Sequence, residues 1–177
     1  MMLKFVCVPL KTNNALCFKS VIVYFISALI DGSNCKAIYE SQLMRNIIQQ
    51  TVNLPAPAEE LFAMYLDASK HAAITGGPVV VGDTQGAPFE AFGGLLSGTI
   101  LTVVKSRLIV QSWRSASFHD EDLDSTLILT FADDDNGGQI DLFHLDVPDH
   151  DLDGVTKGWE KYYWTPWREY LTTTMQG

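Results

Sequence analysis

The stretch Gly158–Leu171, GWEKYYWTPWREYL, decides the fold, because six of its fourteen residues are aromatic and it holds three of the chain's four tryptophans. Successive residues of an α-helix turn by about 100°, so most of these rings, Tyr162 among them, share one side, while Trp164 falls on the other. Large aromatic side chains bury much apolar area. Such a helix needs a wide apolar surface to lie on, and a curved β-sheet offers one. Pro166 lacks a backbone donor and should bend the helix about one turn upstream.

The residues ahead of this helix predict a strand, two short helices and then a run of strands. Asn46–Leu54 alternates like a strand, and helices are expected over 57–67 and 68–74, before the stop signal Thr75-Gly76-Gly77-Pro78. Further strands are expected at Val79–Val81, Phe89–Phe92, Leu95–Val104, Arg107–Arg114, Ser125–Ala132 and Gln139–Val147. Short strands joined by tight turns indicate an antiparallel meander. The predicted fold is therefore α+β, with one strongly curved antiparallel sheet around a long C-terminal helix.

The acidic charge of the chain limits its partners. A formal charge of −9 arises from 21 acidic and 12 basic side chains, and residues 44–177 hold 19 of the acidic and 8 of the basic ones. A surface this acidic repels phosphate backbones and anionic membranes, so we expect neither a nucleic-acid partner nor stable membrane insertion. It suits an uncharged ligand or a basic protein surface. At 177 residues, the chain is long enough to form one domain with a proper core.

The first 43 residues differ in composition from the rest. All three cysteines lie there, at Cys7, Cys17 and Cys35. An odd number without a C-x-x-C pair argues against a disulfide framework and against a zinc site, so we expect a cytoplasmic protein. The apolar run Ser20–Ile30 is shorter than the about 20 residues that a membrane-spanning helix needs.

Three interpretations of this segment remain open. The composition changes at Met44, which favours a translation start there and a domain over residues 44–174. Residues 1–43 could instead be a genuine but poorly ordered extension. The third alternative is a targeting segment with Ser20–Ile30 as its apolar part, although no clean cleavage site follows that run.

Three motifs could suggest chemistry, and each has a simpler explanation. Asp133–Gly138 has alternating acids but lacks the glutamate and the flanking helices of an EF-hand, so a solvated hairpin turn is favoured. The glycines between Gly93 and Gly98 lack the lysine of a phosphate loop, which favours bulges or tight bends. No two of the four histidines have metal-ligand spacing on one element, and no nucleophile elbow occurs. The sequence thus predicts no metal, no cofactor and no catalytic residue.

Two residues of the predicted strands could face an internal cavity. His144 lies between Phe143 and Leu145, so strand alternation puts its side chain on the face opposite both. A hydrogen-bonded or solvent-facing histidine is the simpler alternative. Trp113, which precedes Arg114, is either a core residue or part of a cavity wall.

Seven short motifs occur in order along the chain: PAEELF at 57–62, KHAAITG at 70–76, FGG with SG at 92–98, LIVQSWR at 108–114, DST at 124–126, VP at 147–148 and GWEKYYW at 158–164. Together they resemble the family of activator of Hsp90 ATPase homologue 1-like proteins, over roughly residues 46–172. The resemblance implies a helix-grip fold of the START-like SRPBCC superfamily. In that fold a curved sheet and a long C-terminal helix enclose an apolar pocket.

The resemblance and the aromatic helix together predict a non-enzymatic domain that binds a small hydrophobic or amphipathic ligand in its cavity. The residues expected to touch the cavity are Phe92, Trp113, His144, Trp159 and Tyr163. One alternative is a module that binds an Hsp90-type chaperone or another ATPase, with the acidic surface steering toward a basic partner. Another is an enzyme of the polyketide cyclase kind, in which a cavity histidine or tyrosine acts as general acid or base.

Overall fold

The computed structural model describes residues 46–174 of the chain, and the predictions for residues 1–43 lie outside them. The described strands form one antiparallel sheet of seven, in the order β1-β7-β6-β5-β4-β3-β2. The strands are β1 (Ile47–Leu54), β2 (Val79–Val81), β3 (Pro88–Ala91), β4 (Leu96–Val104), β5 (Leu108–Ser115), β6 (Ser125–Asp134) and β7 (Gly137–Leu145).

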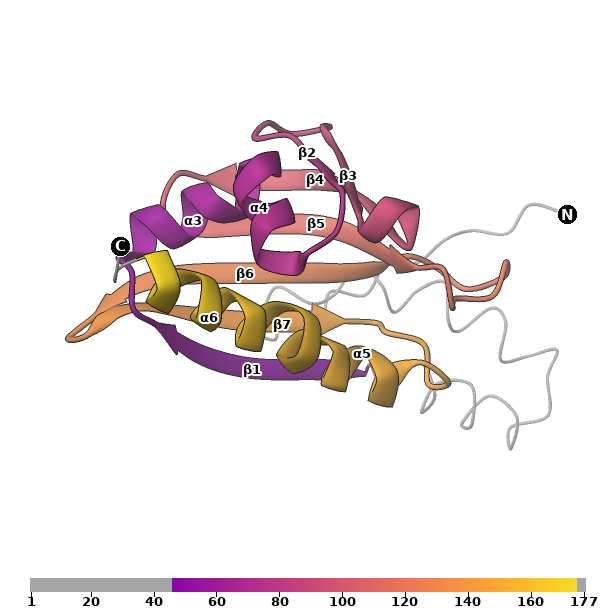
Figure 1. Cartoon of the computed structure of the whole chain (residues 1–177). Helices are drawn as coiled ribbons and strands as arrows, with labels where there is room; N and C mark the ends of the chain where they lie inside the picture. Colours follow the sequence, from indigo (N-terminus) through magenta and orange to yellow (C-terminus); the bar gives the residue numbers. More distant parts are fainter. Residues whose placement is uncertain (1–45, 175–177) are drawn as a thin grey trace, which may run out of the picture. The chain divides into compact units, whose positions relative to one another are not determined.

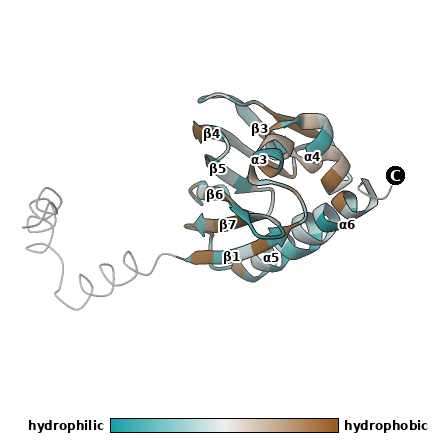
Figure 2. Ribbon diagram, turned by 90° about the vertical axis from the view of Figure 1, so that its left-hand side faces the viewer, coloured by the Kyte–Doolittle hydropathy of each residue, from teal (hydrophilic) through white to brown (hydrophobic). Residues whose placement is uncertain are grey.

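The helices gather on one face of this sheet, and the C-terminal helix lies along β1, β7 and β6 (Figure 1). Seen from the side, the sheet curves around them (Figure 2). They are α3 (Ala58–Leu66), α4 (Ala68–Thr75), the short turn η1 (Phe92–Gly94), α5 (Leu152–Trp159), the π turn η2 (Glu160–Trp164) and α6 (Thr165–Thr174). The predicted α+β helix-grip arrangement is therefore confirmed. Within residues 46–174, no helix has both the length and the apolar character needed to cross a membrane.

Two aspartates fix the start of the first two helices. Asp133, near the end of β6, accepts a hydrogen bond from the Ala58 amide at 2.9 Å. Asp67 accepts hydrogen bonds from the Ser69 and Lys70 amides at 2.9 and 3.0 Å. Side chains in these positions satisfy amides that the first turn of a helix leaves without a partner. The acidic hairpin thus holds α3 against the end of the sheet.

The turn between β6 and β7 is shorter than the sequence predicts. Asp133 pairs with Gly138 in the strand ladder, and Asp134 pairs with Gly137. A Cβ at Gly138 would lie 2.7 Å from the Ala56 carbonyl oxygen. Gly137 and Gly138 therefore belong to β7. Gly138 passes so close to the segment that leads into α3 that a side chain would not fit there.

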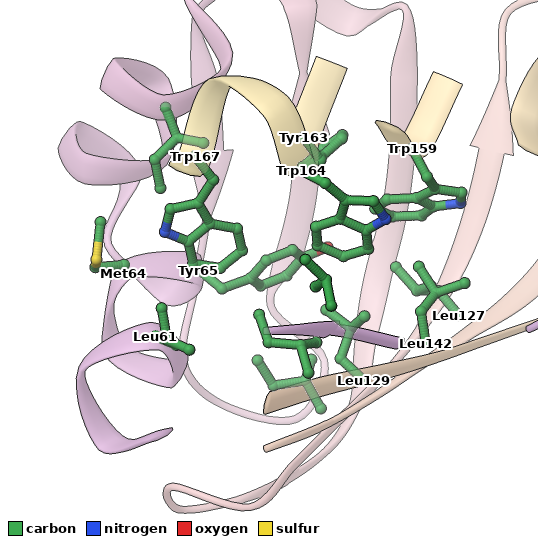
Figure 3. Packing of buried hydrophobic residues seen from close by; sticks show 14 of the residues in the cluster. Leu61, Met64, Tyr65, Leu127, Leu129, Leu142, Trp159, Tyr163, Trp164 and Trp167 are labelled. Atoms are coloured by element: carbon green, nitrogen blue, oxygen red, sulfur yellow. The ribbon is translucent and has the colours of Figure 1, made fainter. Parts of the chain in front are cut away.

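The core lies between the concave face of the sheet and the aromatic side of the C-terminal helix. Alternate residues of β6 and β7 are buried, as a strand with one covered face requires. Figure 3 shows Trp159 and Trp164 of the helix on the side of Leu127, Leu129 and Leu142 of these strands, while Trp167 lies beside Tyr65 and Met64 of α3. The wide apolar surface expected beneath the aromatic helix is thus present.

The prediction of which rings face the core was wrong at two positions. Trp164 is 2% exposed, whereas Tyr162 is 46% exposed. The cause is the π turn η2, in which the Thr165 amide donates to the Glu160 carbonyl five residues back. More residues per turn mean a smaller rotation per residue, which brings Trp164 inward and carries Tyr162 outward. The disturbance expected one turn upstream of Pro166 is this π turn.

Gln50 of β1 forms hydrogen bonds with α5, before the π turn, and with the last residue of the π turn. Its amide nitrogen donates to the Thr156 carbonyl at 3.0 Å, and its amide oxygen accepts from the Trp164 indole at 2.6 Å. The glutamine therefore ties the sheet edge to the helix at the place where the helical register changes.

Candidate functional site

A pocket of about 360 Å³ lies between the C-terminal helix and strands β4 and β5. It is lined by residues of the η1 turn and β4, the end of β5 with the loop after it, and the helical segment α5–η2. These are Phe92, Leu95, Leu96, Trp113, Ser115, Ser117, Asp151, Gly154, Val155, Gly158, Trp159, Tyr162 and Tyr163. Most of the lining is apolar, with few polar groups, which is the usual make-up of a small-molecule pocket.

Two glycines leave the space on the helix side of the pocket. Gly154 and Gly158 lie one helical turn apart, and both line it. A Cβ at Gly158 would contact only the Tyr162 ring, at 3.8 Å. Glycine destabilises a helix interior by about 1 kcal/mol relative to alanine, so helix propensity does not explain these residues. At Gly158 the helix carries no side chain where the pocket lies, whereas a Cβ at Gly154 would lie 2.9 Å from Asp151 Oδ1.

Phe92 reaches the pocket from a tight turn. Its φ is 55°, which is uncommon for a residue other than glycine. Gly93 and Gly94 follow, also with positive φ, so the tight bend predicted at these glycines is confirmed. The Phe92 ring lies 5.8 Å from the Tyr162 ring and 6.1 Å from the Tyr163 ring. The turn therefore closes one side of the pocket with an aromatic ring.

The five residues predicted to touch a cavity lie close together, and four of them line this pocket: Phe92, Trp113, Trp159 and Tyr163. His144 does not line it. The His144 ring lies behind the wall, 4.7 Å from the Trp113 ring and 5.9 Å from the Trp159 ring. Its side chain is fully buried, on the strand face that alternation predicts.

His144 joins two walls of the pocket through hydrogen bonds. The Trp159 indole donates to His144 Nδ1 at 3.2 Å, and His144 Nε2 lies 2.8 Å from Ser125 Oγ. Ser125 Oγ in turn donates to the Trp113 carbonyl at 2.7 Å. Because an indole nitrogen can only donate, Nδ1 accepts and Nε2 carries the proton. Burial lowers the pKa of His144 to about 3, so the ring is neutral and serves as a fixed link.

His71 holds the Tyr163 wall in a similar way. His71 Nδ1 lies 2.7 Å from the Tyr65 carbonyl, which can only accept, so Nδ1 carries the proton. Nε2 then accepts from the Tyr163 hydroxyl at 3.4 Å. Burial lowers the pKa of His71 to about 4, although the Tyr65 carbonyl acts in the opposite direction. Burial also raises the pKa of Tyr163 above its ordinary value. The Tyr163 hydroxyl is therefore hydrogen-bonded to His71 inside the protein.

These contacts suit binding better than proton transfer. A general acid or base works best with a pKa near the operating pH and within reach of the substrate. His144 has both nitrogens engaged and a pKa of about 3, and it lies behind the pocket wall. A polyketide cyclase-like reaction that uses His144 would need a different arrangement.

The sequence-based prediction missed the small and polar residues of the lining. Gly154 and Gly158 carried a usable signal, because two glycines four residues apart interrupt a helix that is otherwise rich in large side chains. Ser115, Ser117 and Asp151 carried none, since they meet only after the strands and the helix have packed.

Comparison with known proteins agrees with this architecture. The chain matches the family model described as Activator of Hsp90 ATPase homolog 1-like protein over residues 55–172. It is 26% identical over 105 residues to the human activator of 90 kDa heat shock protein ATPase homolog 1, covering 59% of this chain and 31% of that protein. A Schizosaccharomyces pombe protein is 26% identical over 136 residues, covering 77% of this chain and 39% of that protein.

A solved structure shows the same fold. The Plasmodium falciparum Hsp90 activator has a TM-score of 0.58 at 23% identity, and the match covers 68% of this chain and 90% of that one. The chain spans less than half the length of the two curated relatives, so the activities of those whole proteins do not transfer directly. The family match itself covers most of the described domain. The chain belongs to the family of activator of Hsp90 ATPase homolog 1-like proteins.

Proposed function

We propose that this domain binds a small, mostly apolar molecule in the pocket beneath its C-terminal helix and does not act as an enzyme. The observation that carries the proposal is the lining: aromatic rings surround the pocket, and internal hydrogen bonds hold Trp159 and Tyr163 in place. Walls that are fixed before a ligand arrives reduce the entropy that binding must overcome. The volume of about 360 Å³ lies within the range of about 300–1,000 Å³ that is typical of ligand pockets.

The polar groups of the lining favour a neutral or cationic ligand with one polar end. Ser115, Ser117 and Asp151 supply hydroxyls and a carboxylate. Trp113, whose buried indole nitrogen has no acceptor among the described residues, also lines the pocket. The carboxylate and the net charge of −9 disfavour an anionic ligand such as a free fatty acid.

Native mass spectrometry of the gently purified full chain tests this proposal directly. A stoichiometric added mass is expected, and it would identify the ligand class. A protein that carries no added mass and also fails to bind neutral apolar compounds would contradict the proposal.

Replacing Gly158 by leucine should block the pocket without harming the fold. The new side chain enters space where a Cβ meets only Tyr162, and a better helix former should add up to about 1 kcal/mol of stability. We expect the affinity for the neutral dye Nile red, followed by its fluorescence, to fall at least about tenfold, which is about 1.4 kcal/mol.

Two controls separate pocket filling from other effects. Gly158→Ala adds one methyl group and should reduce Nile red binding only slightly. Lys157→Leu adds an apolar side chain at an exposed neighbouring position and should leave pocket binding unchanged. Undiminished binding by a folded Gly158→Leu variant would show that the dye binds elsewhere.

A second candidate function is binding to an Hsp90-type chaperone. Family membership supports it, since the human and Plasmodium relatives are described as Hsp90 activators. The acidic surface would steer toward a basic patch, so the association should weaken as salt rises. A pull-down with the Hsp90-type chaperone from the same organism, at low and high salt, tests this. Retention that Gly158→Leu does not alter would separate it from ligand binding.

The proposal also includes the domain limits and the location that the sequence predicts. The functional unit is proposed to be residues 44–174, which contain the whole family match at 55–172. A cytoplasmic location is proposed from the cysteine pattern. Fractionation of cells that produce the full chain would test both, through the size and the compartment of the mature protein.

A further inference from the structure

We propose that His119, Asp122 and His150 form a binding site for a divalent transition-metal ion of the Zn²⁺ class. The site lies on the two loops that follow β5 and β7. It does not depend on ligand binding in the pocket, and it goes beyond any role that the family match suggests.

Sheet topology brings these two loops together. Strands β5 and β7 both pair antiparallel with β6, so they run in the same direction and their following loops leave at the same end of the sheet. His119 and Asp122 lie on the first loop and His150 on the second. The sequence alone predicts no metal site, because no two of its histidines have ligand spacing within one element.

The distances between the three side chains are close to those of a metal site. One ligand atom from each lies within 4.8 Å of the other two. His150 Nε2 is 3.5 Å from Asp122 Oδ2. Two ligand atoms that bind one tetrahedral ion at about 2.0–2.1 Å lie about 3.4 Å apart, so this pair already has the required separation.

The His119 and His150 rings are stacked face to face. Their centroids are 4.0 Å apart with an interplanar angle of 9°. An imidazole lone pair lies in the ring plane, so both rings must rotate about their side-chain bonds to direct one nitrogen each at a shared ion. Both rings are exposed, so an ion can enter from solvent without a change in the fold.

The loop that carries two of the ligands is held in shape by the protein. The Arg114 guanidinium donates to the His119 carbonyl at 2.7 Å and to the Asp122 carbonyl at 2.9 Å. Next to His119, the buried Phe118 ring packs 5.8 Å from the Trp113 ring. The His119 amide donates to Asp122 Oδ2 at 2.7 Å, which orients the carboxylate. Such supporting contacts reduce the ordering that metal binding requires.

The donor set points to a borderline metal. Two imidazoles and one carboxylate suit Zn²⁺, Co²⁺, Ni²⁺ or Cu²⁺, whereas Ca²⁺ and Mg²⁺ prefer oxygen ligands alone. The three protein ligands leave a further coordination position for water. The acidic surroundings, with Asp120 and Glu121 between the ligands of the first loop, favour a cation.

The site also borders the pocket. Ser117, which lines the pocket, has its carbonyl 3.4 Å from His150 Nε2, and Asp151 lines the pocket directly after His150. A bound ion would therefore join the two loops at the edge of the pocket.

Metal titration of the full, untagged chain tests the proposal. Cys7, Cys17 and Cys35 are first replaced by serine, so that thiolates do not contribute. We expect one Co²⁺ per chain in the visible absorption titration, displaced by Zn²⁺. Since loss of a supporting contact alone costs about 10–100-fold in metal affinity, His119→Ala and His150→Ala should each weaken binding at least about tenfold.

Matched variants and a second measurement make the test decisive. Asp122→Asn should weaken binding, whereas Asp120→Asn, on the same loop, should not. Zn²⁺ should raise the melting temperature of the parent protein and of Asp120→Asn, but not that of His119→Ala or His150→Ala. If the His119→Ala/His150→Ala double variant, shown to be folded by circular dichroism, binds Co²⁺ as tightly as the parent, the proposal is wrong. Absence of saturable binding in the parent would overturn it equally.

Discussion

Replacing Gly98 by alanine is expected to destabilise the domain by about 3–5 kcal/mol, a large part of the stability of a typical domain. A Cβ at Gly98 would lie 1.9 Å from the Ser112 carbonyl oxygen and 2.8 Å from its carbon. The obstacle is the backbone of the paired strand β5, which cannot rotate away as a side chain could. The strands would have to separate and lose ladder hydrogen bonds, each of which contributes about 1 kcal/mol.

This change should also abolish binding in the pocket, because β4 and β5 carry Leu96 and Trp113 of its wall. Urea unfolding followed by tryptophan fluorescence measures the loss of stability. Ser97→Ala, at the neighbouring half-buried position of β4, is the matched control and should change stability by no more than about 0.5 kcal/mol. Equal stability of the two variants would mean that β4 and β5 lie farther apart at Gly98 than the structure shows.

The parts of the fold that could be predicted are those governed by local patterns. The end of α4 is an example: Gly76 has a φ of 71° and its amide bonds back to the Ala72 carbonyl, as the run of glycines before Pro78 indicates. The alternation around His144 is another, because a strand turns successive side chains to opposite faces whatever lies above it. Such features need only neighbouring residues.

The predictions that were wrong concern features that depend on contacts between distant parts of the chain. The orientation of Trp164 depends on the π turn, and its indole is held by Gln50, which lies 114 residues away in sequence. A helical wheel assumes one constant rotation per residue, so it cannot show a local change of register. Pro166 signalled that the helix would be disturbed, but not which ring would turn inward.

The candidate site was predictable only for its large residues. Trp159 and Tyr163 lie on the aromatic C-terminal helix, Trp113 lies on the central strand β5, and Phe92 lies on the glycine-rich turn η1. The place of His144 behind the wall depends on Ser125 and Trp159, which meet it only in the folded state. The His119, Asp122 and His150 cluster shows the same limit more clearly, because two loops far apart in sequence supply its side chains.

Two neutral, buried histidines should make the domain sensitive to acid. Burial lowers the pKa of His144 to about 3 and that of His71 to about 4, from an ordinary value of 6.5. As the pH falls below 6.5, both become protonated in the unfolded chain but remain neutral in the folded domain until these lower values. The unfolded state then binds more protons, so the free energy of unfolding falls with pH, by about 1.4 kcal/mol per unit for each histidine. Well above pH 6.5 both histidines are neutral in the folded and in the unfolded state, so they no longer lower the free energy of unfolding.

Between about pH 7 and about pH 5, the two histidines should together lower the free energy of unfolding by about 4 kcal/mol. Urea unfolding at a series of pH values measures this slope, in an interval above the ordinary pKa of most carboxyl groups. His144→Gln retains a group that can accept from Trp159 and donate to Ser125, and it should reduce the slope by about half because one titrating group is gone. A slope that His144→Gln does not alter would show that His144 is not the source of the acid sensitivity.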